Sequence, residues 1–208
     1  MGVIADHFGT ARGLVRLALS WPESLPGLSH ARSPRGKVRR LVFVCHGNIC
    51  RSAYADVLAR TLGAETASFG LSTTSGQGAH PPVAALAQQA GLSLAEHRTT
   101  ARVDYTPQTG DLLLAMEHRH LRKLAADPRL RDIPRVLLGT YANPPLPHLH
   151  DPYELGPAYM ARCLARIDRA VRRLVTRYPA ARLSPPQTFP KIALRSANSG
   201  PGSRADQT

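Results

Sequence analysis

The sequence contains little cysteine, few aromatic residues and no long apolar run. Three cysteines among 208 residues are too few for a disulfide scaffold, and they are typical of a reducing compartment. No stretch of about 18 apolar residues is present, which argues against a transmembrane helix. Aromatic residues make up only 5% of the chain, so few platforms exist on which nucleic-acid bases can stack. These absences predict a cytoplasmic protein.

Acidic residues are scarce relative to basic ones. The chain has 27 Lys and Arg against 14 Asp and Glu, a formal net charge of +13. Such an excess is typical of nucleic-acid binders, so the position of the charge matters. Residues 1–40 hold seven basic and two acidic side chains, and residues 181–208 hold four basic and one acidic. Residues 41–180 between them hold 16 basic and 11 acidic side chains. The excess is densest at the two ends, which disfavours a basic nucleic-acid-binding module and leaves weak contact with a membrane or an acidic partner open.

The two ends have the composition of extensions. Residues 181–208 are rich in Ser, Pro, Gly and Ala without an apolar period, which predicts a disordered tail. Residues 1–38 form a basic extension that we expect to be partly disordered. Arginines interrupt its apolar stretch, which therefore does not resemble a secretory signal. A peripheral amphipathic helix is one interpretation, and a loosely packed extension is the simpler one; the apolar residues are Leu14, Val15, Ala18, Leu19 and Trp21.

Residues 39–180 alternate between strand-like and helix-like patterns. Short runs rich in aliphatic side chains predict strands at 41–45, 66–69, 111–115 and 135–138. Helical spacing of apolar residues predicts helices at 52–62, 82–90, 117–126 and 157–177. Such alternation predicts a single α/β domain with a four-stranded parallel sheet and helices on both faces. Ligands bind at the carboxyl ends of the strands in such folds, so the loop after the first strand is the first candidate for a site.

That loop has the composition of an anion-binding site. A strand, a short loop and a helix N-terminus bring several backbone N–H groups and the helix dipole to one point. In this environment we expect Cys45 to be a thiolate near neutral pH. Arg51 can grip two phosphate oxygens, and the Ser52 hydroxyl can donate to the thiolate. The predicted phosphate-binding residues are His46, Gly47, Asn48, Ile49, Cys50, Arg51 and Ser52.

A thiolate that faces a phosphate predicts nucleophilic displacement through a phosphocysteine intermediate. The leaving group then needs a proton, and a water must later be activated. Asp151, on a loop that follows the fourth predicted strand, is the candidate for both steps. Pro152 stiffens that loop, and Tyr153 offers an aromatic wall for a phenyl ring. This chemistry requires no metal and no cofactor.

The motif VCHGNICRS with a distant DPY resembles the low-molecular-weight protein tyrosine phosphatases. Ser68-Phe69-Gly70, Gly91 to Arg98, Asp111 to Glu117 and Leu137 to Tyr141 fall where that family has its other landmarks. The resemblance implies Cys45 as nucleophile, Arg51 as phosphate clamp and Asp151 as general acid and then base. It also implies that the residues that shape the loop are Asn48, Ser52, Ser68 and His97. In this family, a residue at the position of Cys50 can form a protective disulfide with the nucleophile.

The resemblance has departures and leaves alternatives. Residues 71–78 lack the aromatic side chain with which some relatives grip the substrate. Arsenate reductases of this fold need two further cysteines, and only Cys163 remains. A protein arginine phosphatase is a closer alternative, although Ile49 resembles the phosphotyrosine type. The partner implied is a phosphotyrosine protein, which in bacterial relatives is often a tyrosine kinase or a protein of exopolysaccharide export.

Overall fold

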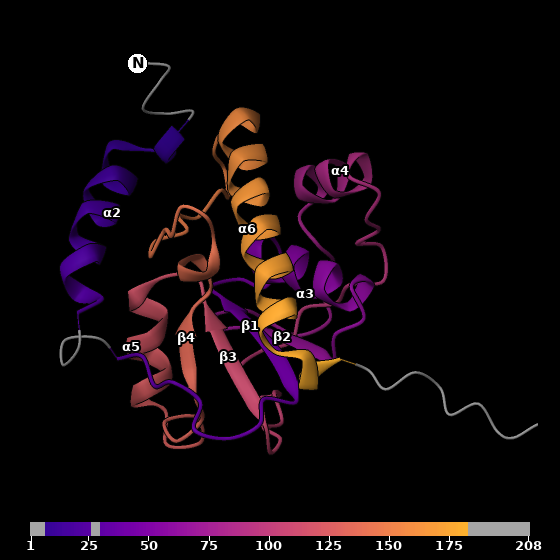
Figure 1. Ribbon diagram of the computed structural model, residues 1–208. Helices are drawn as coiled ribbons and strands as arrows, with labels where there is room; N and C mark the ends of the chain where they lie inside the picture. The colour runs from indigo at the N-terminus through magenta and orange to yellow at the C-terminus, as the bar shows by residue number, and fades with distance from the viewer. Residues whose placement is uncertain (1–6, 26–29, 183–208) are drawn as a thin grey trace, which may run out of the picture.

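The structure is a computed structural model that describes residues 7–25 and 30–182 (Figure 1). Its centre is a sheet of four parallel strands in the order β2-β1-β3-β4. The strands are β1 (Arg40–Cys45), β2 (Thr66–Gly70), β3 (Asp111–Ala115) and β4 (Arg135–Leu137). β1 and β3 are buried along almost their whole length, as their aliphatic runs predict.

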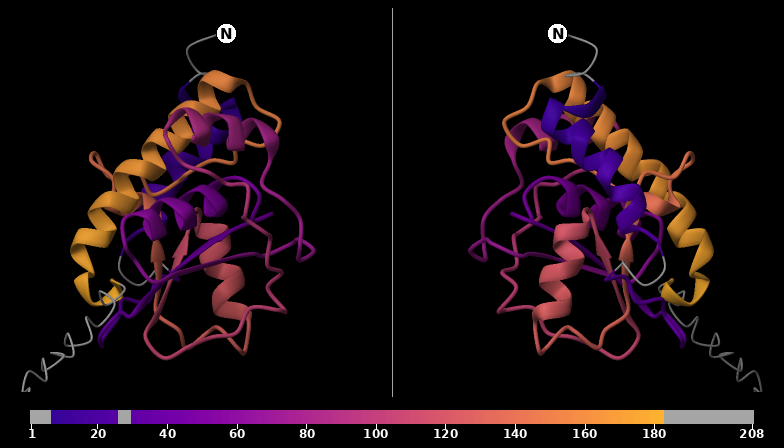
Figure 2. Two further views of the ribbon diagram at one scale, coloured as in Figure 1. Left: turned by 90° about the vertical axis from the view of Figure 1, so that its right-hand side faces the viewer. Right: turned by 90° about the vertical axis from the view of Figure 1, so that its left-hand side faces the viewer.

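Helices cover both faces of the sheet, so the predicted fold class is confirmed (Figure 2). One face packs against α3 (Arg51–Thr61), α4 (Pro81–Gln89) and α6 (Pro157–Arg177). The other packs against α5 (His118–Ala126). Because side chains alternate along a strand, Phe43 belongs to the first core and Val44 to the second.

Two predicted boundaries differ in ways that matter for the site. β4 ends at Leu137 because Leu138 begins the 3-10 helix η1 (Leu138–Tyr141). α5 begins at His118 rather than at Glu117, whose backbone is extended, with φ −149° and ψ 155°. Glu117 therefore lies directly beyond the carboxyl end of β3.

The N-terminal extension contains a helix, α2 (Ala11–Glu23), where we favoured a loosely packed segment. Thr10 caps the helix, because its hydroxyl accepts a hydrogen bond from the Gly13 N–H at 2.9 Å. Figure 1 shows α2 at one side of the molecule, beyond α5. Among the described residues, no helix has the length and apolar character needed to cross a bilayer.

The described residues after α6 stay packed on the domain, since Ala181 is buried. A last 3-10 helix, η2 (Pro179–Ala181), follows α6, and Arg182 forms an isolated bridge with Ala64. The rest of the tail for which we predict disorder, residues 183–208, lies outside the described residues.

Candidate active site

The loop between β1 and α3 surrounds the sulfur of Cys45. The Asn48 N–H donates to Cys45 Sγ at 3.2 Å, and the Ser52 hydroxyl lies 3.0 Å from the same sulfur. Asn48 has a φ of 56°, the left-handed conformation that Asn tolerates better than most residues, and this turns its N–H inward. Two polar groups at the buried sulfur stabilise negative charge there.

The side chain of Asn48 connects the loop to its surroundings. Its amide donates to Ser52 Oγ at 2.8 Å and to Ser68 Oγ at 3.1 Å. Because Ser52 Oγ accepts that bond, its own proton is available to Cys45. The Asn48 amide oxygen accepts from the Thr100 N–H at 2.9 Å. Asn48 is fully buried, so every bond of this side chain restrains the loop.

His97 and Asp56 complete the network. The Nε2 of His97 lies 2.7 Å from the backbone carbonyl of Asn48. Burial lowers the pKa of His97, so the neutral ring donates from Nε2 to that carbonyl. The Ser68 hydroxyl donates to Asp56 Oδ2 at 3.0 Å. The structure thus brings together all four residues expected to shape the loop, and it adds Asp56 and Thr100, which the sequence analysis missed.

Arg51 is a buried guanidinium with a fixed orientation. Its Nη1 donates to Glu117 Oε1 at 2.7 Å and to the Leu149 carbonyl at 2.8 Å. Its Nη2 lies 2.5 Å from Asp151 Oδ2 in an ion pair, while neither Nε nor Nη2 has a regular hydrogen bond within the protein. Burial alone would lower the pKa of Arg51, but the charges of Asp151 and Glu117 raise it. Nη1 is therefore held by Glu117 and the Leu149 carbonyl, and phosphate oxygens that bind along the Nε–Nη2 edge would take the place of the Asp151 carboxylate.

Glu117 is a site residue that sequence analysis missed, although it does follow a strand at the edge where the site lies. It is 1% exposed and lies between cations, with Arg119 Nη2 at 2.7 Å and Arg16 Nη1 at 3.9 Å. Burial would raise the pKa of Glu117, but the charge and hydrogen bond of Arg51 hold it well below its ordinary value. Glu117 is therefore a carboxylate that keeps Arg51 in place.

The predicted acid and the aromatic wall lie on the loop between η1 and α6. The Asp151 side chain is 29% exposed, and its Oδ1 accepts from the Tyr153 N–H at 3.3 Å. The Tyr153 ring is 45% exposed, and its centroid lies 5.1 Å from that of His80. His80 precedes α4, and its N–H donates to the Ile49 carbonyl at 2.9 Å. Tyr153 and His80 therefore form a pair of rings beside the loop, and His80 is a further residue that the sequence analysis missed.

The remaining loop residues differ in exposure. His46 is exposed, and partial burial together with the cations Lys123 and Arg119 lowers its pKa. Gly47 and Ile49 are half-buried. Cys50 is buried at the start of α3, and burial raises the pKa of its thiol.

Comparison with known proteins decides the family. Residues 40–183 match the family model described as low molecular weight phosphotyrosine protein phosphatase. This chain belongs to that family. The match includes the loop, Glu117 and Asp151, and it begins beyond α2. Helix α2 is thus an addition to the low molecular weight phosphatase domain.

Individual relatives of this phosphatase agree. It is 29% identical to the probable low molecular weight protein-tyrosine-phosphatase EpsP of Ralstonia solanacearum over 69% of this chain and 98% of EpsP. It is 31% identical to Wzb of Escherichia coli K12 over 64% of this chain and 90% of Wzb. The crystal structure of the Erwinia amylovora tyrosine phosphatase AmsI superposes with a TM-score of 0.60 at 26% identity, covering 71% of this chain and 98% of AmsI.

Proposed function

We propose that this phosphatase hydrolyses phosphotyrosine, an aryl phosphate monoester, through a phosphocysteine on Cys45. One observation carries the proposal: the Cys45 sulfur lies in a loop whose N–H and hydroxyl groups face it, with Arg51 and Asp151 alongside. Strand β1 ends at this loop and α3 begins after it, so the helix dipole also favours an anion here. The catalytic domain comprises residues 39–180.

In the first step, the Cys45 thiolate attacks phosphorus as the bond to the tyrosine oxygen breaks. Arg51 Nε and Nη2 and the backbone N–H groups of residues 46–52 bind the phosphate oxygens and stabilise the charge of the transition state. Asp151 donates a proton to the leaving phenolate. Tyrosine leaves, and the phosphoryl group is now bonded to Cys45 Sγ.

In the second step, water attacks the phosphocysteine. Asp151, now a carboxylate, takes a proton from that water, the S–P bond breaks and phosphate is released. The sulfur leaves as a thiolate, which Asn48 and Ser52 stabilise. No metal or cofactor enters either step.

The rim of the site favours an aromatic substrate. Tyr153 and His80 offer two ring faces against which a phenyl ring can pack, and Ile49 adds an apolar side chain. The relatives EpsP and Wzb are named protein-tyrosine-phosphatases. The partner we propose is a phosphotyrosine protein in the cytoplasm, either a tyrosine kinase or a protein of exopolysaccharide export.

A protein arginine phosphatase is the second candidate, since this fold supports it. YwlE arginine phosphatase superposes with a TM-score of 0.58, but at 23% identity this likeness shows the fold alone. An arsenate reductase is disfavoured. Of the two further cysteines that it needs, only Cys163 remains, and Cys163 is buried in α6, where burial raises the pKa of its thiol to about 12.

Hydrolysis of p-nitrophenyl phosphate tests the chemistry. The Cys45→Ser variant is expected to lose activity. The control variant Cys163→Ser, which replaces a different buried cysteine, is expected to retain it. Phosphate on Cys45 should be detectable by mass spectrometry after rapid acid quench. Activity of Cys45→Ser at the wild-type level would refute the mechanism.

Peptides with phosphotyrosine or phosphoarginine distinguish the two candidate substrates. We expect a higher kcat/KM for phosphotyrosine, and the reverse order would assign the enzyme to phosphoarginine. Capture of phosphoproteins by Cys45→Ser or Asp151→Ala then identifies the partner.

A further inference from the structure

Helix α2 packs on the domain with its small and polar residues. Gly13 and Ser20 are its buried positions. A Cβ at Gly13 would lie 2.9 Å from the His150 ring, so only glycine permits this approach. Thr10 Oγ1 lies 3.3 Å from His150 Nε2, and Ser24 Oγ lies 3.0 Å from His118 Nε2. These contacts fix which side of α2 faces the protein.

The opposite side of α2 is apolar and faces solvent. Val15 and Leu19, which lie one helical turn apart, are 56% and 57% exposed. Trp21 is 53% exposed. Of the seven exposed large hydrophobic side chains among the described residues, this helix and the residues just after it hold five: Leu14, Val15, Leu19, Trp21 and Leu25. Surface helices normally bury such a face, so this one is available for an interaction.

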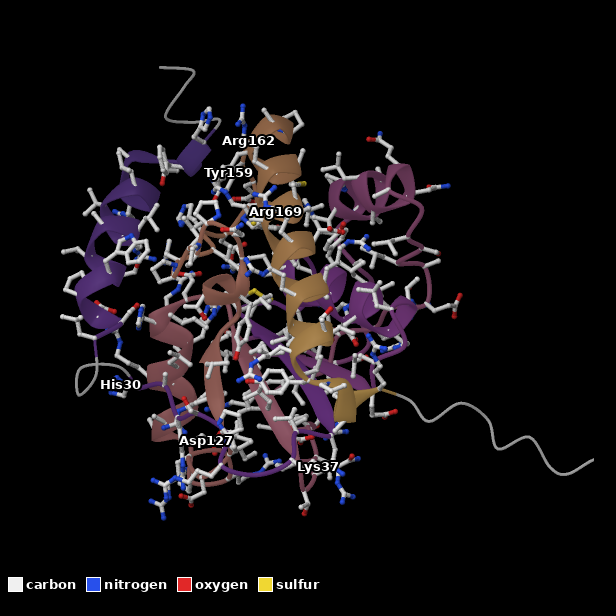
Figure 3. All side chains as sticks on the ribbon, in the orientation of Figure 1. His30, Lys37, Asp127, Tyr159, Arg162 and Arg169 are labelled. Carbon is white, nitrogen blue, oxygen red and sulfur yellow. The ribbon has the colours of Figure 1, made fainter. Side chains whose placement is uncertain are left out.

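Basic side chains flank this apolar face. Arg12 is exposed on α2 itself, and Arg122 is exposed on the neighbouring α5, where it contacts Glu23 of α2. Arg162 lies in the second turn of α6, close to the segment that precedes α2, and its Nη1 is 2.9 Å from His7 Nε2 (Figure 3). Glu23 is the acidic residue of α2, and its carboxylate lies 3.4 Å from Arg122, so these two charges offset each other and the positive charge of the surroundings comes from Arg12 and Arg162. The surroundings of the face are therefore positive.

We infer that α2 binds the surface of an anionic lipid bilayer with its exposed apolar face. Leucine, valine and tryptophan side chains would enter the boundary between headgroups and acyl chains, while Arg12 and Arg162 contact lipid phosphates. A helix of 13 residues is too short to span the membrane and lies along it. Because the opposite side of α2 holds the domain, the helix can bind lipid without leaving the protein.

This arrangement places the active site close to the membrane. The start of α2 contacts His150, which precedes Asp151, and Arg16 contacts Glu117, which holds Arg51. Phosphotyrosines near the bilayer surface would then be reached in preference to those far from it. The inference rests on α2 and the basic residues beside it, so it stands whether the substrate is phosphotyrosine or phosphoarginine.

Trp21 makes the test direct, because it is the only tryptophan of the chain. The full-length protein is mixed with vesicles of phosphatidylcholine or of phosphatidylcholine with phosphatidylglycerol. We expect Trp21 emission to move to shorter wavelength with the anionic vesicles, brominated acyl chains to quench it, and salt to weaken binding. Unchanged emission with anionic vesicles overturns the inference, and equal affinity for neutral vesicles overturns the choice of an anionic surface.

Substitutions test the face itself. The double variant Val15→Ser, Leu19→Ser keeps Trp21 and should lower the vesicle partition coefficient by about 10- to 100-fold. Val103→Ser is the matched control, because Val103 is 68% exposed but distant from α2 in the chain, and it should bind as wild type. Both should hydrolyse p-nitrophenyl phosphate at the wild-type rate in solution, which shows that they fold. A dimer that the double variant dissociates, without vesicle binding by the wild type, would assign the face to a second copy and overturn the inference.

Discussion

Arg51 and Glu117 form an ion pair in which each side chain is 1% exposed and 2.7 Å separates Nη1 from Oε1. A guanidinium buried to this extent requires a carboxylate partner, because an unpaired buried charge is costly. The pair also decides which edge of Arg51 faces the substrate. The clamp of this enzyme is thus a pair of residues from α3 and from the end of β3.

The first prediction concerns Glu117→Gln. This variant keeps the size of the side chain but loses the charge that orients Arg51. We expect kcat/KM to fall about 10- to 100-fold, since a hydrogen bond to a charged group contributes about 1.5–3 kcal/mol. Weaker inhibition by inorganic phosphate would show that the clamp is affected, and Glu117→Asp should restore part of the loss. Asp132→Asn, which breaks the exposed pair with Arg32, is the control and should leave both values unchanged. Wild-type phosphate affinity in Glu117→Gln would contradict a positioning role.

The second prediction concerns Asp151→Ala. Loss of a general acid should slow turnover by roughly 10²–10⁴. The loss should be smaller for p-nitrophenyl phosphate than for phenyl phosphate, because p-nitrophenolate leaves more easily without a proton. Glu154→Gln removes a neighbouring exposed carboxylate on the same loop and serves as the control. An equal loss with both substrates, or an unchanged pH–rate profile, would remove Asp151 from proton transfer.

The third prediction concerns stability in acid. Burial lowers the pKa of His148 from 6.5 to about 4, and burial together with the charge of Arg51 lowers that of His120 well below its ordinary value. Between pH 6.5 and 4 the unfolded chain therefore binds protons that the folded chain does not, so the free energy of unfolding falls as pH falls. The slope approaches about 1.4 kcal/mol per pH unit for each such histidine. Urea unfolding at several pH values measures it, and His148→Gln should reduce it. An identical slope in the variant would contradict this assignment.

The fourth prediction concerns oxidation. The Cys45 thiolate should attack hydrogen peroxide, break its O–O bond and become a sulfenic acid with release of hydroxide. The Cys50 thiol should then attack that sulfur, expel water and form a Cys45–Cys50 disulfide. Burial raises the pKa of Cys50, so we expect Cys50 to act second and slowly. Mass spectrometry of peroxide-treated protein should show the bridge and recovery of activity with dithiothreitol. In Cys50→Ala, activity should be lost irreversibly; reversible inactivation of that variant would argue against a protective role for Cys50.

Much of the site could be predicted because it is local in the chain. Cys45, Asn48, Arg51 and Ser52 lie within eight consecutive residues, and a strand, a turn and a helix start impose their arrangement. The four strands and the helices of the domain could be predicted from apolar periodicity for the same reason. Asp151 could be assigned to the same edge of the sheet as Cys45, because the carboxyl ends of parallel strands all lie at one edge.

Other parts of the site depend on contacts between distant segments. Glu117, Asp56, Thr100 and His80 each come from a separate element, and no spacing in the sequence pairs Glu117 with Arg51, 66 positions earlier. Their role follows from strand order, which places β3 next to β1, and from hydrogen bonds that only the packed chain forms. Pattern alone gives such residues no more weight than any other polar residue near a strand end.

Helix α2 shows the division most clearly. Sequence alone indicates a basic segment with a short apolar stretch, for which a loosely packed extension is the simpler interpretation. The usual rule would turn its apolar side inward. In the tertiary structure the apolar side of α2 faces solvent instead, because the helix packs on the domain through Gly13. A larger residue at that position would not allow so close an approach to His150. Sequence by itself thus determined the phosphate-binding loop and the sheet that carries it, while only the tertiary structure decided what holds Arg51 and which side of α2 meets solvent.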